Sequence, residues 1–172
     1  YLTCFIFCIV CYLSALKSSI FYMDNKKLEV IEFSKKLNNT NLSPLRSGNI
    51  SVRTQIDGED GFYITPSGIK YENLKEEDIV FLSNEKEYDF LKIFNSGLNP
   101  SSEWRFHQDI YVNKKEAKAI VHAHSNCATA VSTHQKSIPA FHYMVAVAGG
   151  VDIKCSKYAT FGTKNLSRHI IK

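Results

Sequence analysis

The chain has 172 residues, which is enough for one domain with a sizeable core and too few to call for two. Hydrophobic residues make up 44% of the chain and charged residues 22%, and these globular proportions exclude a disordered or fibrous protein. The net charge is only +4, and the Lys and Arg residues form no stripe, so we expect no nucleic-acid partner.

The first 22 residues differ in composition from the rest. Residues 1–13 are apolar and uncharged, but a membrane-spanning helix needs roughly 20 apolar residues, so we expect no membrane partner. This run holds three of the five cysteines at the spacing C-x3-C-x2-C, which could bind an iron–sulfur cluster, although its apolar surroundings argue against one. The odd total of cysteines argues against complete disulfide pairing and favours a reducing, cytoplasmic location. We expect residues 1–22 to be upstream translation outside the domain, which runs from Met23 to residue 172.

Hydrophobic periodicity predicts a mixture of helices and strands. Val30, Phe33 and Leu37 recur at helical spacing and indicate an amphipathic first helix. Ile50 and Val52 alternate with polar residues, as in a half-buried strand, and two Asp-Gly pairs then mark the turn of a hairpin. In chain order we expect a helix over 23–37, strands over 49–55, 62–65 and 79–82, a polar loop over 85–99, a helix opening at 100–102, a strand over 119–124 and a helix over 126–133. This mixture predicts an α/β or α+β sandwich rather than a Rossmann fold.

The strand over 119–124 carries two histidines in the sequence AIVHAH. Residues i and i+2 of a strand project from the same face, so His122 and His124 converge on one point. Two converging imidazoles suit zinc or a similar divalent ion, and the alternative is a hydrogen-bonded pair of core histidines. Cys127, three residues on, is most simply a small buried residue.

The segment PSSEWRFH opens the second long helix. Ser101 and Ser102 could cap this helix, or their hydroxyls and the neighbouring N–H groups could hold an anion such as phosphate. Glu103 falls in the first turn, where it favours the helix dipole, but beside a metal it could be a ligand or a general base. Trp104, His107 and Tyr111 share one face of the helix, and Trp104 reads as core.

Two further turns, SGN at 47–49 and TPSG at 65–68, have backbone N–H groups that could also cradle a phosphate. Taken in order and spacing, SGNISVR, ITPSGIKYENL, PSSEWRFH, AIVHAH, IPAFHYMVAVAGG and YATFGT resemble the class II aldolase/adducin family. The Trp-Arg-Phe after the glutamate looks most like the branch of the family that acts on fuculose phosphate. The resemblance covers 23–172 and implies an α/β fold, a three-layer arrangement of a sheet flanked by helices, assembled as a homotetramer with active sites between subunits.

The resemblance also implies roles for individual residues. It implies that Glu103 is the catalytic acid/base and ligates the metal in the resting site, and that His122 and His124 bind zinc or another divalent ion. The implied phosphate-binding residues are Gly48, Asn49, Ser67, Gly68, Ser101 and Ser102. Tyr143 and Phe161 would reach into a neighbouring subunit's site, whereas without the resemblance both would be ordinary aromatic core. Cys155 matches a family cysteine without a chemical role.

The chain departs from the family pattern at its C-terminal end. The third zinc histidine of the family, in a His-His-Gly segment, is expected beyond Lys172, as are the C-terminal helices and a tyrosine proton donor. We therefore expect a domain that is incomplete at the C-terminus, with function belonging to the complete protein. Catalytic zinc uses three protein ligands, and this chain offers two histidines and Glu103.

The implied function is zinc-dependent aldol cleavage or condensation of a phosphorylated sugar, giving dihydroxyacetone phosphate and an aldehyde. Two alternatives use the same scaffold, a pentulose-phosphate 4-epimerase and a methylthioribulose-phosphate dehydratase. A third alternative is a non-catalytic, adducin-like binding module. The intact HAH and SSE motifs favour an enzyme, because a binding module has no physical need for zinc ligands.

Overall fold

The computed structural model describes residues 7–9, 25–88, 97, 99–147 and 149–172. The predictions for the three N-terminal cysteines concern side chains outside the described set, and most of the predicted loop over 85–99 lies outside it too. The strands are β1 Phe7–Ile9, β2 Asn49–Ile56, β3 Glu59–Ile64, β4 Val80–Ser83 and β5 Ala119–Ala123. The helices are α1 Lys26–Asn39, α3 Trp104–Asn113, α4 Asn126–Ser132, α5 Tyr143–Val147 and α6 Lys164–Ile170, with short 3₁₀ turns η1 Pro44–Arg46, η2 Tyr71–Asn73 and η3 Glu76–Asp78.

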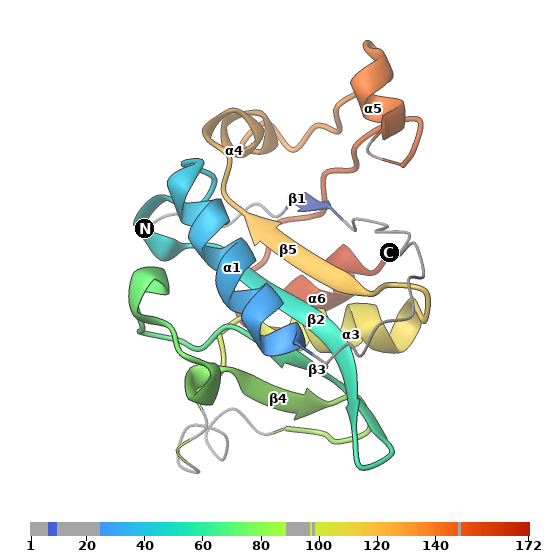
Figure 1. The fold of residues 1–172 in the computed structure, drawn as a ribbon. Coiled ribbons are helices and arrows are strands. Elements are labelled where there is room, and N and C mark those ends of the chain that lie inside the picture. The colour runs from blue at the N-terminus through green and yellow to red at the C-terminus, as the bar shows by residue number, and fades with distance from the viewer. Residues whose placement is uncertain (1–6, 10–24, 89–96, 98, 148) are drawn as a thin grey trace.

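The strands form one sheet in the order β1-β5-β2-β3-β4, and every neighbouring pair is antiparallel. Figure 1 shows α1 across one face of this sheet and α3 and α6 behind it. The predicted three layers and the early hairpin β2–β3 are therefore confirmed, and a parallel Rossmann sheet is excluded. The short strand β1 falls within residues 1–22, and the division of the chain at Met23 stays a prediction.

One core cluster lies between α1 and the sheet. Val30 and Leu37 are buried as predicted, but Phe33 is 41% exposed, with the Lys36 ammonium 4.7 Å from its ring centroid. The buried stripe instead follows Val30, Ile31, Ser34 and Leu37, because α1 turns its i, i+1, i+4 and i+7 positions toward the sheet. This cluster consists of Val30, Ile31, Tyr71, Leu74 and Ile79.

The larger core cluster lies between the sheet and α3. Trp104, His107 and Tyr111 are at most 1% exposed, so the predicted shared face of this helix is confirmed. The opposite face of β2 was expected to be polar and solvated, yet Ser51 is fully buried because α3 covers it. The apolar members are Phe62, Ile64, Val80, Leu82, Trp104, Phe106, Ile110, Tyr111, Ala117, Ile120 and Leu166.

The register of β2 against β5 sets the position of the candidate site. Asn49 at the start of β2 lies opposite His122 near the end of β5, and Ser51 lies opposite Ile120. Because side chains alternate along a strand, Asn49, Ser51 and His122 all project toward α3. Within the described residues, no helix combines the length and the apolar character that crossing a membrane requires.

Candidate metal and phosphate site

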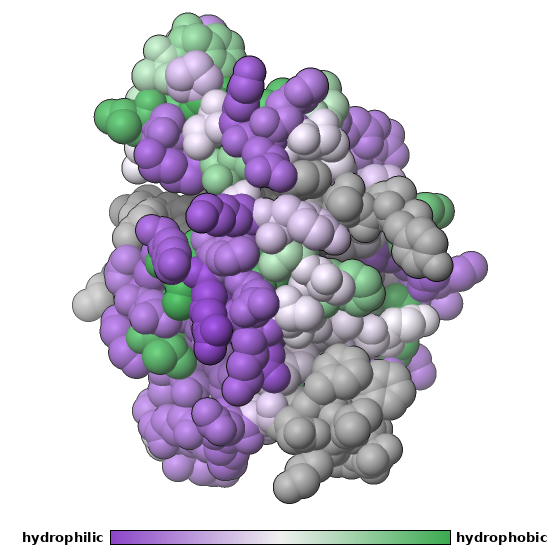
Figure 2. Space-filling view, turned by 180° about the vertical axis from the view of Figure 1, so that it is seen from behind, coloured by the Kyte–Doolittle hydropathy of each residue, from purple (hydrophilic) through white to green (hydrophobic). Residues whose placement is uncertain are grey.

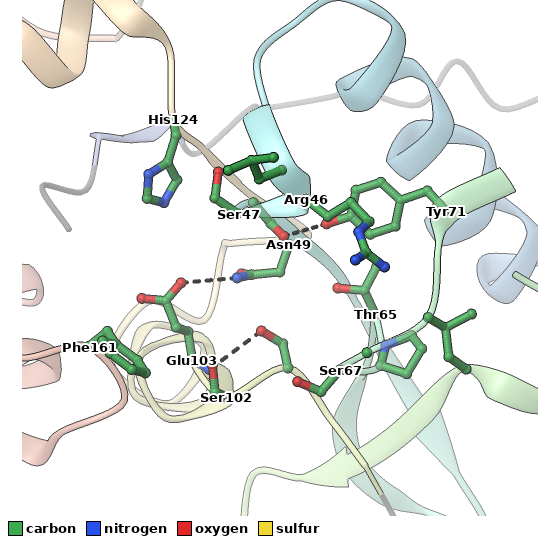
Figure 3. Close-up of a pocket in the computed structure, with 16 residues that line it drawn as sticks. Arg46, Ser47, Asn49, Thr65, Ser67, Tyr71, Ser102, Glu103, His124 and Phe161 are labelled. Atoms are coloured by element: carbon green, nitrogen blue, oxygen red, sulfur yellow. Dashed lines mark hydrogen bonds between the residues drawn. The ribbon is translucent and has the colours of Figure 1, made fainter. Parts of the chain in front are cut away.

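A cavity of about 330 Å³ opens at the end of the β2–β5 pair (Figure 3). Three turns line it, over 45–49, 65–69 and 101–103, and His124 closes one side. The six residues predicted to bind phosphate all line this cavity: Gly48, Asn49, Ser67, Gly68, Ser101 and Ser102. The structure therefore brings them together, while their role toward a phosphate stays a prediction.

The first turn is held by close packing at Gly48. A Cβ atom there would lie 2.4 Å from the carbonyl oxygen of His122 and 2.9 Å from Leu37, so only glycine fits. The Gly48 N–H donates to Ser43 Oγ at 2.9 Å, and its carbonyl accepts a hydrogen bond from the Tyr71 hydroxyl. Both partners are buried, which fixes the backbone at the rim of the cavity.

The other two turns are held against each other by backbone hydrogen bonds. Ser67 donates its N–H to the Asn99 carbonyl at 2.8 Å, and Ser101 donates to the Thr65 carbonyl at 2.9 Å. Gly68 has a φ of +81°, the left-handed conformation that favours glycine. The two turns therefore present Ser67 and Ser102 to the same space, as Figure 3 shows.

Three possible metal ligands meet beside this cavity. Glu103, His122 and His124 each offer one ligand atom, all within 4.8 Å of one another. Glu103 Oε2 lies 3.0 Å from His122 Nε2, which lies 2.8 Å from His124 Nε2. Glu103 and His124 line the cavity, and His122 lies fully buried behind it. The predicted convergence of the two histidines is confirmed, and the glutamate from the start of α3 joins them.

The protonation states of this cluster suit metal binding. Burial alone would raise the pKa of Glu103, but the charge of His122 and hydrogen bonds from His122 and Asn49 outweigh burial and hold this pKa below its ordinary value of 4.5. Burial, followed by the charge of His122, lowers the pKa of His124 to about 4. Near neutral pH the carboxylate is thus ionised and His124 is neutral, the forms in which both groups ligate metals.

The donor set itself fits a divalent ion of the zinc type. One carboxylate oxygen and two imidazole nitrogens are ligands that catalytic zinc uses, with a further position left for water or substrate. All three side chains are buried and converge on one point, so little rearrangement is needed for them to share an ion.

The other residues singled out in the sequence either lie outside the cavity or differ from their predicted burial. Phe161 lines the cavity of its own chain, while Tyr143 on α5 does not and is 72% exposed. The alternative that both aromatics are core is wrong for this chain, because Phe161 is also 58% exposed. Cys127 is exposed rather than buried, because its side of α4 faces away from the sheet core, and Cys155 is partly buried.

The sequence analysis assigned no role at the site to Arg46 or His107. Among the described residues that line the cavity, Arg46 is the only Lys or Arg, and Figure 3 shows its guanidinium turned toward Thr65. Arg46 and the preceding Leu45 both have positive φ angles, +61° and +55°, which no sequence signal announces. His107 is fully buried one turn after Glu103, and the shared helical face was the only signal for it.

Comparison with known proteins identifies the family to which the chain is similar. Residues 28–172 match the family described as Class II Aldolase and Adducin N-terminal domain. The L-fuculose phosphate aldolase of Escherichia coli (strain K12) is 44% identical over 150 residues, 86% of this chain and 65% of that protein. The 5-methylthioribulose-1-phosphate/5-deoxyribulose-1-phosphate aldolase of Rhodospirillum rubrum is 42% identical over 142 residues, 83% of this chain and 60% of that protein.

A solved structure of an L-fuculose 1-phosphate aldolase matches the fold with a TM-score of 0.72 and 36% identity, over 86% of this chain and 66% of that one. The chain therefore spans just under two thirds of the length of the relatives that it matches.

Proposed function

The chain belongs to the class II aldolase and adducin family, and we propose that it carries the metal and phosphate site for aldol cleavage of a ketose phosphate. The products would be dihydroxyacetone phosphate and an aldehyde. One observation carries the proposal: the ionised Glu103 and the pair His122 and His124 converge beside a cavity that is lined by three turns and by the Ser67 and Ser102 side chains.

The phosphate end of the substrate would sit among the three turns. Ser67, Ser102 and Arg46 all line the cavity, and hydroxyl and guanidinium groups are donors that bind phosphate well. Binding energy from this end would orient the sugar toward Glu103 without contributing to the bond that breaks. The relatives share a phosphorylated ketose in their names and differ in the rest of the sugar, so we propose the phosphorylated end as the common element.

Glu103, His122 and His124 would hold the divalent ion, for which we propose zinc. Such an ion supplies a Lewis acid that polarises the carbonyl group next to the breaking bond. Cleavage removes the proton from the hydroxyl that becomes the aldehyde and returns a proton to the carbon left on the phosphorylated fragment. We propose that Glu103 moves the proton at this carbon: in condensation its ionised carboxylate takes the proton from the carbon, and in cleavage the protonated carboxyl group returns it.

The partner of this chain is proposed to be further copies of itself. Phe141, Tyr143, Val147 and Val151 are each at least 70% exposed and lie on the segment around α5, which projects from the sheet in Figure 1. Figure 2 shows hydrophobic side chains over the same projection. Contact with a neighbouring copy would cover them, as expected for a homotetramer with shared sites.

The two described cysteines are both free thiols, which supports the proposed cytoplasmic location.

The test is metal content together with turnover. The complete protein, purified and loaded with zinc, is expected to cleave L-fuculose 1-phosphate or 5-deoxyribulose 1-phosphate, with the released dihydroxyacetone phosphate measured by coupling to a reductase. His124→Gln should lose zinc and turnover together, and His134→Gln, a surface histidine outside the site, should keep both. Phosphate binding without zinc and without turnover would favour the binding module. Zinc-dependent epimerisation or dehydration without cleavage would favour the sister enzymes.

A further inference from the structure

A row of buried polar side chains leads away from Glu103 between β2 and α3. It passes through Asn49, His107 and Ser51 and ends at Tyr111. Ser51, His107 and Tyr111 are 0% exposed, Asn49 is 3% exposed and Glu103 is 5% exposed. Burying five polar groups in a row costs free energy unless each is hydrogen-bonded, so their arrangement requires an explanation beyond packing.

The direction of the first two hydrogen bonds follows from Glu103. An ionised carboxylate can only accept, so the Asn49 atom 3.1 Å from Glu103 Oε2 is the amide nitrogen, which donates. This leaves the Asn49 amide oxygen facing His107 Nε2. An amide oxygen also only accepts, so His107 carries its hydrogen on Nε2.

The rest of the row follows from the state of His107. This ring is fully enclosed, and burial lowers its pKa to about 3, so it is neutral and its Nδ1 has no hydrogen. Nδ1 therefore accepts from Ser51 Oγ at 2.6 Å. The Ser51 hydroxyl has one hydrogen, which it has now donated, so the Tyr111 hydroxyl 2.8 Å away donates to it. Every hydrogen bond in the row points toward Glu103.

Both elements supply this row through their own periodicity. Asn49 and Ser51 are two apart on β2. His107 and Tyr111 are four apart on α3, and Glu103, the N-cap of that helix, precedes His107 by four residues, so both sets face each other. At the far end, the guanidinium of Arg53 lies 4.8 Å from the Tyr111 ring. The Tyr111 end of the row is thus held away from the cavity, and the hydrogen bonds of the row point toward the cavity.

We propose that His107 is a positioning residue for Glu103, acting through the Asn49 amide. Ser51 and Tyr111 fix the tautomer of His107, His107 then fixes which way the Asn49 amide points, and the amide N–H holds Glu103 Oε2 where it meets the histidines. The consequence for metal binding and catalysis rests on the proposed function, whereas the direction of the hydrogen bonds does not. Outer-shell groups that orient a ligand are worth about 10- to 100-fold in metal affinity or activity.

The first test reads the hydrogen bonds directly by nuclear magnetic resonance on the full chain with isotope-labelled histidine and asparagine. We expect His107 to be neutral with its hydrogen on Nε2, and the Asn49 side-chain NH₂ to exchange slowly with solvent. His107→Leu should speed that exchange. A hydrogen on Nδ1, a charged ring, or unchanged exchange in His107→Leu would overturn the proposal.

The second test separates positioning from stability. Zinc affinity should fall about 10- to 100-fold in His107→Leu and recover in part in His107→Gln, whose amide can again donate to Asn49. Gln108→Leu is the matched control, because Gln108 is a buried polar neighbour on α3 that hydrogen-bonds to the Ser83 and Lys86 carbonyls instead. It should lose stability but keep zinc affinity.

The outcomes distinguish the two proposals. If the wild-type chain binds zinc and His107→Leu binds it equally well, the positioning proposal is wrong and the proposed function stands. If wild-type protein binds no zinc, the proposed function fails, and the His107 tautomer and Asn49 exchange still decide whether the directed row exists. Equal losses in His107→Leu and Gln108→Leu would make His107 a structural residue only.

Discussion

Replacing Glu103 by glutamine is the most informative single change. In the structure Glu103 Oε2 accepts from Asn49 Nδ2 at 3.1 Å and faces His122 Nε2 at 3.0 Å, and the side chain is almost fully buried. Glutamine keeps the shape but replaces one oxygen by an NH₂ group. Both donors meet the same oxygen, Oε2, so the amide oxygen of glutamine can take its place, but neither hydrogen bond is then made to a charged group.

The size of the effect follows from this geometry. A hydrogen bond to a charged group contributes about 1.5–3 kcal/mol, so Glu103→Gln should lower the free energy of unfolding of the metal-free protein by about that amount. A glutamate that only favours the helix dipole would contribute about 0.3–1 kcal/mol. Turnover should fall by about two to four orders of magnitude if Glu103 moves the proton.

The assay combines urea unfolding, zinc content and coupled turnover on the same samples. Glu76→Gln is the matched control, because Glu76 is an exposed glutamate at the start of η3, and it should change none of the three quantities beyond error. Loss of turnover together with zinc would make Glu103 a ligand first, and loss with zinc retained would make it the base. Retained turnover with unchanged stability would refute both roles and the hydrogen-bond geometry behind them.

Five other substitutions test the remaining parts of the site. Ser101→Ala and Ser102→Ala should each weaken sugar-phosphate binding by about 1.5–3 kcal/mol, and an unchanged Michaelis constant would remove them from the phosphate site. Arg46→Gln should raise the Michaelis constant with little effect on the turnover number, which steady-state kinetics will show. Gly48→Ala should destabilise the fold by about 1–3 kcal/mol in urea unfolding, because the added methyl meets a backbone oxygen 2.4 Å away. The pKa of His107 is about 3 in the folded state against 6.5 ordinarily, so its neutral form stabilises above pH 6.5 and this contribution is lost as pH falls toward 3. The slope should be about 1.4 kcal/mol per pH unit, and His107→Leu should lack it in unfolding experiments at successive pH values.

The strand and turn chemistry could be predicted from the sequence because it is local. His122 lies on β5 and His124 follows directly after it, two positions on, so they meet at the end of that strand. The turn at Gly68 was also predictable, because its glycine has a φ of +81°, a conformation that favours glycine. The first helix was also predicted, but its buried stripe was misplaced by Phe33, because i+3 and i+4 positions flank the same face and only packing selects between them.

What the sequence could not predict depends on which elements pack together. Ser51 reads as a solvent-facing strand residue, and only the presence of α3 over that face explains its complete burial. From the sequence, Glu103 could either favour the helix dipole or act beside a metal. The structure brings it to 3.0 Å from His122 because α3 begins beside the end of β5. Arg46 enters the cavity through a left-handed turn that no residue type there announces.

The arrangement explains why the proposed metal ligands and the turns proposed to bind phosphate occur side by side. The antiparallel pairing of Asn49 with His122 places the start of β2 against the end of β5, and the backbone bond from Ser101 to Thr65 brings the start of α3 to the same end. The turn that precedes β2 and the turn that precedes α3 therefore line the cavity. The last residue of the second turn, Glu103, is the candidate ligand, and the first residue of β2, Asn49, supports it. Because both groups are fixed by the same backbone pairings, the distance between them is a property of the sheet and not of loop flexibility. A substrate held there must carry its phosphate and its reacting carbonyl a short, fixed distance apart, which a ketose phosphorylated next to its carbonyl provides.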